Sequence, residues 1–145
     1  MKKDTCALLE RAISIAVEAH RGQEDRNGAP YILHPLRMMC RVETQTQKIV
    51  AVLHDVVEDT DWTFKDLKHE GFGRQILEAL DCLTKHDGED YEDFIQRSAT
   101  NSLARRVKIA DLEDNMDVRR LKSVGEKDKE RLEKYLRAWR QLQGT

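Results

Sequence analysis

Apolar residues recur along most of this chain at the three- and four-residue spacing that is typical of amphipathic helices. A first stripe predicts a helix that starts near Asp4 or Thr5, either of which can cap it, and ends before Gly22. Later stripes predict helices over about 76–83, 91–98, 102–116 and 127–143. No segment shows the two-residue alternation of a sheet strand, so we expect an all-α fold.

Two segments before residue 60 add to this pattern. Pro35 suits the first turn of a helix, which places His34 at the cap of a second helix that runs to about residue 43. The segment 47–59 is apolar around most of a helical circumference. A helix of this kind is buried, and we expect it at the centre of the fold.

Polar and glycine-containing stretches separate the predicted helices. The segments 22–30 and 86–90 are expected to be loops, and Thr63 with Asp66 resembles a capping box for a short helix. The chain has no internal repeat, low-complexity segment or long linker. We therefore expect residues 1–145 to form a single helical-bundle domain.

Composition excludes several classes of protein. The 25 basic and 27 acidic residues nearly cancel, which argues against nucleic acid as a partner. No segment has the apolar length of a membrane span or of a signal peptide, so we expect a cytoplasmic chain without membrane contact. Cys6, Cys40 and Cys82 are widely separated, which predicts reduced thiols rather than disulfides or a zinc motif.

Candidate chemistry lies inside the most apolar predicted helix, which contains the sequence HDVVED at 54–59. Buried charge is costly unless it is paired or bound to metal. Helical spacing places His54 and Glu58 on one line, and Asp55 and Asp59 on the adjacent line. One helix face then carries an imidazole and three carboxylates, which is half of a metal site.

The remaining ligands of such a site must come from elsewhere in the chain. His34, at a predicted helix start, and Asp111, in a mainly apolar segment, are the best candidates. Each also has a structural interpretation: a helix cap for His34, an ion pair with Lys108 for Asp111, and a solvated helix end for the Glu58 and Asp59 pair. Their joint pattern favours the metal site.

His34, His54-Asp55 and Asp111, in this order, resemble the H…HD…D signature of the HD-domain phosphohydrolases. Nearly the whole chain is similar to one branch of them, the hydrolase domain of the RelA/SpoT alarmone enzymes. The segments that carry this similarity are AHRGQ at 19–23, GAPYILHP at 28–35, LHDVVEDT at 53–60 and KIAD at 108–111.

The resemblance implies a reaction and a cofactor. A length of 145 residues leaves no room for the synthetase and regulatory domains of the bifunctional enzymes, so the similarity is to the stand-alone small alarmone hydrolases. The implied reaction removes the 3′-pyrophosphate of ppGpp or pppGpp. The expected ligands, His34, His54, Asp55 and Asp111, suit Mn²⁺ and are compatible with Fe²⁺ or Zn²⁺. In the family, the residues equivalent to Glu58 and Asp59 orient the attacking water or carry its proton.

The resemblance also implies substrate contacts. Positions that match nucleotide-contacting residues of the family are Arg26, Asn27, Asn115, Arg131 and Tyr135. The chain departs from the guanosine-specific enzymes at Asp25 and Asp117, where those enzymes commonly carry arginine. A carboxylate there removes stacking on the base and repels phosphate, so an adenosine alarmone such as ppApp is a second candidate substrate.

Three questions stay open at this stage. The chain could be an HD-domain hydrolase for another nucleotide phosphate, or a non-catalytic helical interaction module, although no ligand of the motif is missing. His20 could be a further ligand, but its place at a helix end favours a bond to free carbonyl groups. The sequence does not decide between a monomer and a homo-oligomer.

Overall fold

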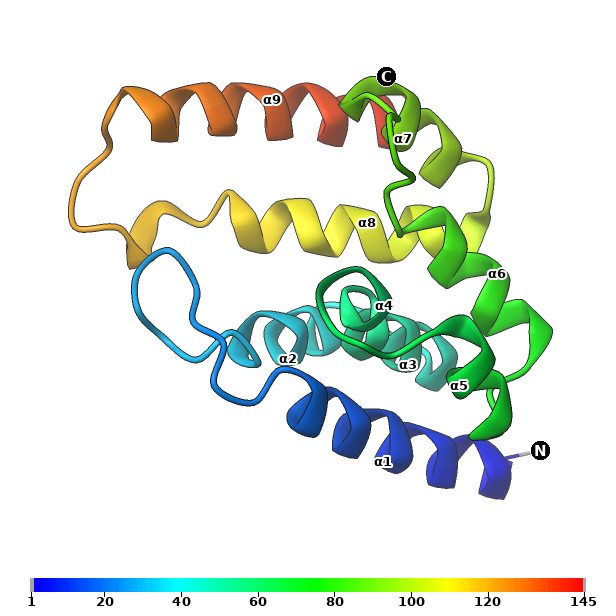
Figure 1. Ribbon diagram of the computed structural model, residues 1–145. Helices are drawn as coiled ribbons and strands as arrows, with labels where there is room; N and C mark the ends of the chain where they lie inside the picture. Colours follow the sequence, from blue (N-terminus) through cyan, green and yellow to red (C-terminus); the bar gives the residue numbers. More distant parts are fainter. Residues whose placement is uncertain (1, 145) are drawn as a thin grey trace.

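The computed structural model describes residues 2–144, which form helices joined by loops (Figure 1). Among the described residues, β pairing is limited to an isolated antiparallel bridge between Glu24 and Pro30. The all-α prediction is confirmed. The helices are α1 Lys2–Ala19, α2 Leu33–Cys40, α3 Gln45–Leu53, α4 Val56–Asp59, α5 Phe64–His69, α6 Arg74–Cys82, α7 Tyr91–Ala99, α8 Ser102–Asn115, the 3₁₀ helix η1 Val118–Arg120 and α9 Glu126–Leu142.

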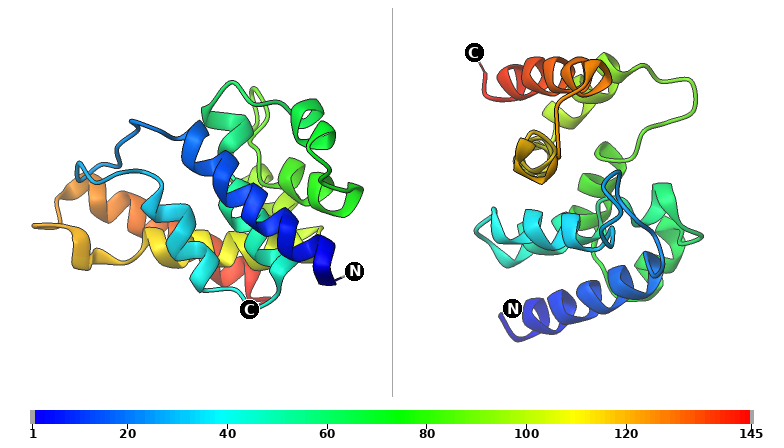
Figure 2. Two further views of the ribbon diagram at one scale, coloured as in Figure 1. Left: turned by 90° about the horizontal axis from the view of Figure 1, so that it is seen from below. Right: turned by 90° about the vertical axis from the view of Figure 1, so that its left-hand side faces the viewer.

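Helix α3 is the centre of the fold, as its apolar pattern predicts. It contacts α1, α2, α6 and α8, and every residue from Ile49 to Leu53 is at most 1% exposed. Burying an aliphatic side chain of this size contributes roughly 1.5–3 kcal/mol. The main hydrophobic core therefore forms around α3, and α1 lies on the side of the molecule away from α8 and α9 (Figure 2).

A second, smaller cluster of apolar side chains joins the last helices. It contains Ile95, Leu112, Ala138 and Leu142, from α7, α8 and α9. Helix α9 runs back along α8, and the two lie side by side (Figure 1). Helix α8 thus belongs to both clusters, since Ala104, Val107 and Ala110 face the main core. The polar residues of α8 lie between the helices of the main core and the helices of the smaller cluster.

The predicted single helix over 47–59 is wrong in one respect, because α3 ends at Leu53 and α4 begins at Val56. Asp55 has φ −109° and ψ 3°, outside the helical region. His54 Nδ1 lies 2.8 Å from the carbonyl oxygen of Ala51. The His54 side chain therefore occupies the Ala51 carbonyl oxygen. If the helix continued, that oxygen would accept a hydrogen bond from a backbone amide.

Other element boundaries differ by a few residues. Helix α1 begins at Lys2, and a capping role for the Asp4 side chain lies outside the described residues. Helix α2 begins at Leu33, so His34 lies in its first turn rather than at its cap. Pro35 is tolerated there because amides of the first turn need no intrahelical partner. The capping box of Thr63 and Asp66 is confirmed.

The length and the apolar character of the helices can be compared with those of a membrane span. None of the helices between residues 2 and 144 is both long enough and apolar enough to span a bilayer.

Candidate active site

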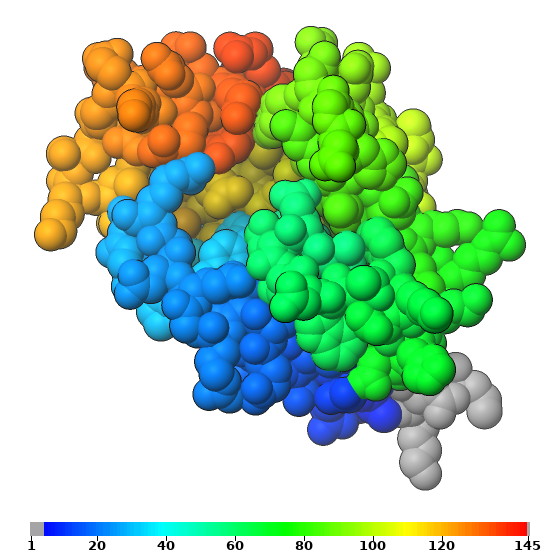
Figure 3. All heavy atoms as spheres, in the orientation of Figure 1, coloured from blue at the N-terminus to red at the C-terminus, as the bar shows by residue number. Residues whose placement is uncertain are grey.

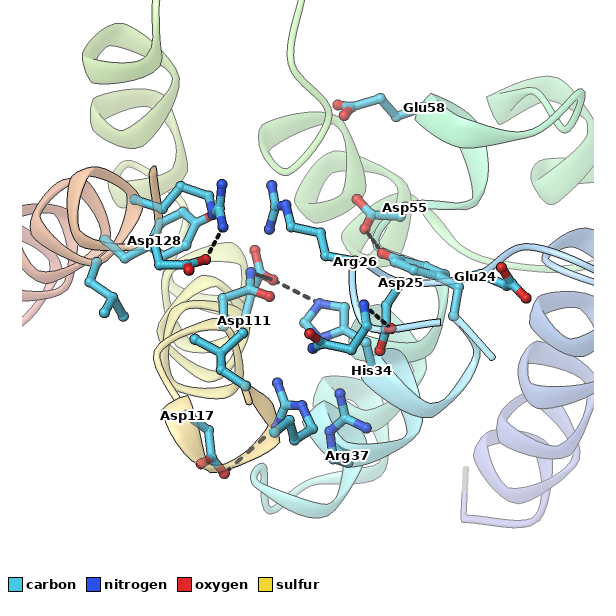
Figure 4. A pocket seen from close by; sticks show the side chains of 18 residues that line it. Glu24, Asp25, Arg26, His34, Arg37, Asp55, Glu58, Asp111, Asp117 and Asp128 are labelled. Atoms are coloured by element: carbon cyan, nitrogen blue, oxygen red, sulfur yellow. Dashed lines mark hydrogen bonds and ion pairs between the residues drawn. The ribbon is translucent and has the colours of Figure 1, made fainter. Parts of the chain in front are cut away.

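A cavity of about 490 Å³ lies between the two groups of helices. The loop before α2, the start of α4, one face of α8 and the first half of α9 surround it, and its mouth is the hollow between these segments in Figure 3. His34, Asp55, Glu58 and Asp111 are among its lining residues (Figure 4). The fold therefore brings the candidate chemistry of three separate segments to one place.

Three of the expected ligands form a compact group. Potential ligand atoms of His34, His54 and Asp111 all lie within 4.8 Å of one another, and all three residues are buried. His34 Nε2 is 2.9 Å from Asp111 Oδ1, and His54 Nε2 is 3.9 Å from the same oxygen. Two imidazole nitrogens and one carboxylate oxygen thus face a common point, and we call these residues the ligand trio.

The ring of His34 is oriented from behind. Its Nδ1 lies 2.6 Å from Asp114 Oδ2, and Asp114 is fully buried. Nδ1 donates to this carboxylate and Nε2 faces Asp111, and a carboxylate behind the ring is found at many metal-bound histidines. Burial would lower the pKa of His34, but the hydrogen bonds to Asp111 and Asp114 raise it to about 9.

His54 is oriented in the same way by the main chain. Its Nδ1 donates to the Ala51 carbonyl oxygen, so Nε2 carries the lone pair. Within residues 2–144 this buried Nε2 has no hydrogen-bond partner of acceptable geometry, although Asp55 Oδ2 lies 2.9 Å away. Burial lowers the pKa of His54, but Asp55 and Asp111 outweigh it and the net shift is upward. The surroundings of Nε2 therefore attract a cation.

Asp111 is held at both of its oxygens. Lys108 Nζ donates to Oδ2 at 2.7 Å, and Asn115 Nδ2 donates to Oδ1 at 3.0 Å. Burial would raise the pKa of Asp111, but Lys108, His34 and the neighbouring His54 hold it well below its usual value. The expected ion pair with Lys108 therefore exists, and it leaves Oδ1 directed at the two histidines.

Asp55 adjoins the ligand trio through His54. It also accepts a hydrogen bond from the Tyr31 hydroxyl group, and Tyr31 lies three residues before His34. Burial raises the pKa of Asp55, but His54 and the hydrogen bonds lower it to about 2. A fixed, ionised carboxylate next to the trio is available as a fourth ligand.

These observations fit a divalent metal ion. The donor set combines neutral imidazole nitrogens with carboxylate oxygens, and each histidine has its second nitrogen engaged behind it. The unpartnered Nε2 of His54 is the kind of buried polar atom that a bound ion satisfies. Mixed nitrogen and oxygen ligands suit Mn²⁺, Fe²⁺ or Zn²⁺.

Glu58 and Asp59 follow the ligands in α4, and both are exposed. Glu58 lines the cavity and accepts a hydrogen bond from the Lys85 amide at 2.8 Å. Asp59 lies next to it and is not among the cavity-lining residues. Partial desolvation of its carboxyl group, together with the charges of Asp55 and Glu58, raises the pKa of Asp59 to about 6.

The expected substrate-binding residues surround the same cavity. Arg26, Asn27, Asn115, Arg131 and Tyr135 all line it. Arg26 projects from the loop into the opening (Figure 4), and none of its atoms makes a hydrogen bond or ion pair recorded among the described residues. Arg131 forms an ion pair with Asp128, one turn earlier in α9.

The carboxylate groups of Asp25 and Asp117 both have partners within the protein. Asp25 Oδ1 accepts hydrogen bonds from the amides of Asn27 and Ala29, so it shapes the loop. Asp117 caps η1 and pairs with Arg119 at 2.7 Å. Hydrogen bonds from Arg119 hold the pKa of Asp117 far below its usual value. Asp117 is therefore paired with Arg119, and its effect on a phosphate group stays a prediction.

Several residues of the site escaped sequence reasoning. Tyr31, Arg37, Asp114 and Arg120 line or support the cavity. Their only sequence signal is spacing, since Tyr31 lies three residues before His34 and Asp114 three residues after Asp111. Charged residues at such positions are typical of solvated helix faces, and only the fold turns them inward.

His20 lies just beyond the end of α1, and it is 2% exposed. Its Nδ1 is 2.8 Å from Gln23 Oε1, and its ring packs against Tyr31 at 4.8 Å between centroids. The predicted bond from the His20 side chain to a free carbonyl group is not found. His20 instead packs against Tyr31, while His69 and His86 are exposed.

Known proteins share sequence with this chain over most of its length. It is 31% identical over 120 residues to "guanosine-3′,5′-bis(diphosphate) 3′-pyrophosphohydrolase" of Aquifex aeolicus, covering 74% of this chain and 17% of that protein. It is 31% identical over 119 residues to "bifunctional (p)ppGpp synthase/hydrolase SpoT" of Escherichia coli, covering 79% and 16%. A "probable GTP pyrophosphokinase" of Mycobacterium leprae is 32% identical over 127 residues, covering 79% and 16%.

The chain thus spans about a sixth of the length of these relatives. No protein-family model matches it. Among solved structures, a metazoan ortholog of SpoT, described as hydrolysing ppGpp, has the same fold. The TM-score is 0.76 at 22% sequence identity, covering 94% of this chain and 85% of the other.

Proposed function

We propose that this chain, a homologue of the RelA/SpoT proteins over a segment of their length, is a metal-dependent phosphohydrolase of the HD-domain type that removes the 3′-pyrophosphate of a (p)ppGpp-type alarmone. The products are pyrophosphate and the nucleoside 5′-diphosphate or 5′-triphosphate. The observation that carries this proposal is the ligand trio, in which two oriented imidazole nitrogens and one carboxylate oxygen share a buried point at the cavity wall.

We infer that His34, His54 and Asp111 would hold the metal, with Asp55 as a fourth ligand. Mn²⁺ is the expected ion, and Fe²⁺ and Zn²⁺ suit the same donors. A bound divalent ion would lower the pKa of a coordinated water and polarise a phosphoryl oxygen. Asp114 and the Ala51 carbonyl keep the two rings in the orientation that this requires.

Glu58 and Asp59 are proposed to manage the proton of the attacking water. The pKa of Asp59, raised to about 6, places its titration close to neutral pH, where a carboxylate can both accept and return a proton. Glu58 is fastened to the Lys85 amide, so its carboxylate has a defined place at the cavity wall.

The cavity offers groups for the nucleotide itself. Arg26 and Arg131 would contact phosphate oxygens, Asn27 and Asn115 supply amides, and Tyr135 offers an aromatic surface for the base. Asp25 is committed to the amides of its own loop, so no guanidinium stacks on the base from that position. This observation keeps an adenosine alarmone such as ppApp as a second candidate substrate.

The test is pyrophosphate release from ppGpp and ppApp, measured side by side with Mn²⁺ and with GDP as a substrate that lacks the 3′ group. We expect release from at least one alarmone, none from GDP, and loss of activity with a chelator. His54→Ala is expected to abolish turnover while helix content is retained. Turnover of GDP, or release that survives chelation, would contradict the proposal, and the faster alarmone identifies the base.

A further inference from the structure

One end of the cavity is lined by two arginine side chains that the proposed reaction has not used. Arg37, from α2, donates from Nε to Asp114 Oδ1 at 2.8 Å and from Nη2 to Asp114 Oδ2 at 3.0 Å. Arg120, from η1, donates from Nη2 to the Asp114 carbonyl oxygen at 2.7 Å. Asp114 is fully buried and cannot turn towards solvent, so both guanidinium groups are bound to a fixed residue.

The two guanidinium groups still have capacity for a ligand. Their side chains are 31% and 30% exposed, and both line the cavity. In the described part of the chain, Arg37 Nη1 makes no recorded hydrogen bond. Arg120 Nη1 lies 3.5 Å from Asp114 Oδ1 and 3.6 Å from Asp117 Oδ2, and Arg119 also pairs with Asp117, at 2.7 Å. Two arginines and two carboxylates therefore meet at this end of the cavity, and Arg37 Nη1 keeps its N–H donors for a ligand.

Arg37 and Arg120, which we call the arginine pair, are connected to the ligand trio. Asp114 joins them, because the same carboxylate that binds Arg37 also accepts from His34 Nδ1. Asn115, the next residue of α8, donates to Asp111 in the trio. In Figure 4 Arg37 lies on one side of His34, and Arg26 lies on the other. A ligand at the trio therefore lies close to fixed positive charge.

The opposite end of the cavity is less suited to a second phosphate group. Arg131 there pairs with Asp128, whose side chain is 21% exposed, and Arg26 is an exposed residue on a loop, so neither is held by a fully buried residue. Arginine binds phosphate oxygens best when its guanidinium plane is held in advance, since two parallel N–H donors can then meet two oxygens. Arg37 and Arg120 meet that condition.

We propose that Arg37 and Arg120 form a second phosphate subsite, which binds the 5′-phosphate group of a nucleotide whose 3′-pyrophosphate lies at the ligand trio. This inference rests on the proposed function. It explains why the substrate would carry phosphate at both the 3′ and the 5′ position of its ribose. It also assigns the 5′ group, rather than the base, as the feature recognised at this end of the cavity.

The test compares two substrates that differ only in the 5′ group: ppGpp and guanosine 3′-diphosphate, which lacks 5′-phosphate, or the adenosine pair if that base is preferred. KM is measured for wild type, Arg37→Met and Arg120→Met. We expect wild type to have the lower KM for ppGpp. Each substitution should raise KM for ppGpp about tenfold more than KM for guanosine 3′-diphosphate, because one charge-assisted contact to the 5′ group is lost.

Arg119→Met is the matched control, since Arg119 has the same charge in the same helix η1, but its side chain is 85% exposed and does not line the cavity. It should leave the ratio of the two KM values unchanged. If Arg37→Met and Arg120→Met weaken both substrates equally, the arginines act only by supporting Asp114 and His34, and the subsite proposal is wrong. No change in either KM overturns it as well.

Failure of the proposed function gives a different result. If wild type hydrolyses none of these compounds, affinity for GDP and for guanosine is measured instead by calorimetry. The subsite predicts that wild type binds GDP more tightly than guanosine, and that Arg120→Met removes the difference. Equal affinity of wild type for GDP and guanosine would overturn the subsite independently of any reaction.

Discussion

At the scale of single residues, Asp114 has the widest influence on the site. Its carboxylate accepts from His34 and Arg37, and its carbonyl oxygen accepts from Arg120. Burial would raise the pKa of Asp114, but the hydrogen bonds from His34 and Arg37 lower it to about 2. The ionised form of one side chain therefore supports both the metal ligand and the arginine pair.

Asp114→Asn tests this role through stability. The unfolded pKa of an aspartate is about 3.9. A folded pKa near 2 means that the charge stabilises the fold above about pH 4, and that this contribution is lost as pH falls towards 2. We expect a loss of about 3 kcal/mol at pH 7, because buried positive charge loses its partner. In urea unfolding, the gap between wild type and variant should narrow between pH 4 and pH 2.

The exposed Asp87→Asn serves as the control for that series and should match wild type throughout. A gap that is the same at pH 7 and at pH 2.5 would show that Asp114 acts through shape and not through its charge.

Tyr31→Phe removes the hydroxyl group that donates to Asp55 and leaves the ring in place. Outer-shell partners of this kind typically change metal affinity by about 10- to 100-fold. We expect Mn²⁺ affinity, measured by competition with a chelating dye, to fall by about tenfold. Tyr91→Phe is the matched control, because among the described residues the buried Tyr91 hydroxyl group has no partner. Equal affinity of Tyr31→Phe and wild type would remove Tyr31 from the support of the site.

At the scale of elements, the break between α3 and α4 determines how the HDVVED segment is used. A continuous helix would place His54 and Glu58 on one line. The turn at Asp55 instead leaves His54 directed at Asp111, while Glu58 reaches the loop at Lys85. One short segment thereby supplies a ligand to the buried trio and a carboxylate to the cavity wall.

Glu58→Gln separates two roles of that carboxylate. The amide oxygen of glutamine can still accept from the Lys85 amide, so the loop should stay in place. The variant cannot take up a proton, and loss of a general base typically costs about 100- to 10,000-fold in rate. We expect circular dichroism and Mn²⁺ affinity like those of wild type, with turnover reduced at least a hundredfold. Normal turnover would leave Glu58 as a loop anchor only.

The elements also show what the sequence could and could not predict. Burial of α3 is predictable because five consecutive apolar residues have no alternative to the core. The break after Leu53 is not, because it depends on the bond from His54 to a carbonyl, which periodicity does not detect. The closeness of His34 to Asp111 came from family resemblance. Arg37 and Arg120 were missed, because an arginine on a helix looks the same whether it faces solvent or a cavity.

At the scale of the whole molecule, the site lies where two hydrophobic clusters meet. Helix α2 supplies His34, the residue that follows α3 is His54, and α8, which joins both clusters, supplies Asp111. A metal ion held by all three would tie the two parts together. Binding should therefore stabilise the fold as a unit.

Metal-linked stability gives a prediction about the whole chain. With Mn²⁺ at 100 times its dissociation constant, the free energy of unfolding should rise by about 2.7 kcal/mol. His54→Ala should remove this gain. A stabilisation by Mn²⁺ that persists in His54→Ala would place the metal elsewhere.

The affinity for metal should depend on pH. The pKa of His34 in the metal-free chain is raised to about 9, so at neutral pH the metal must displace a proton from this ring. Apparent Mn²⁺ affinity should therefore increase from pH 6 to pH 8, which calorimetric titrations in matched buffers would measure. An affinity that is constant over this range would contradict a direct role for His34.

The most direct test of the proposed reaction is identification of the products of ppGpp, or of ppApp if that is the better substrate, after a single turnover with Mn²⁺. We expect pyrophosphate and the nucleoside 5′-diphosphate in equal amounts, because the bond to the 3′ oxygen breaks and the 5′ group stays intact. Orthophosphate as the first product, or a product that retains the 3′-pyrophosphate, would contradict a 3′-pyrophosphohydrolase at this site.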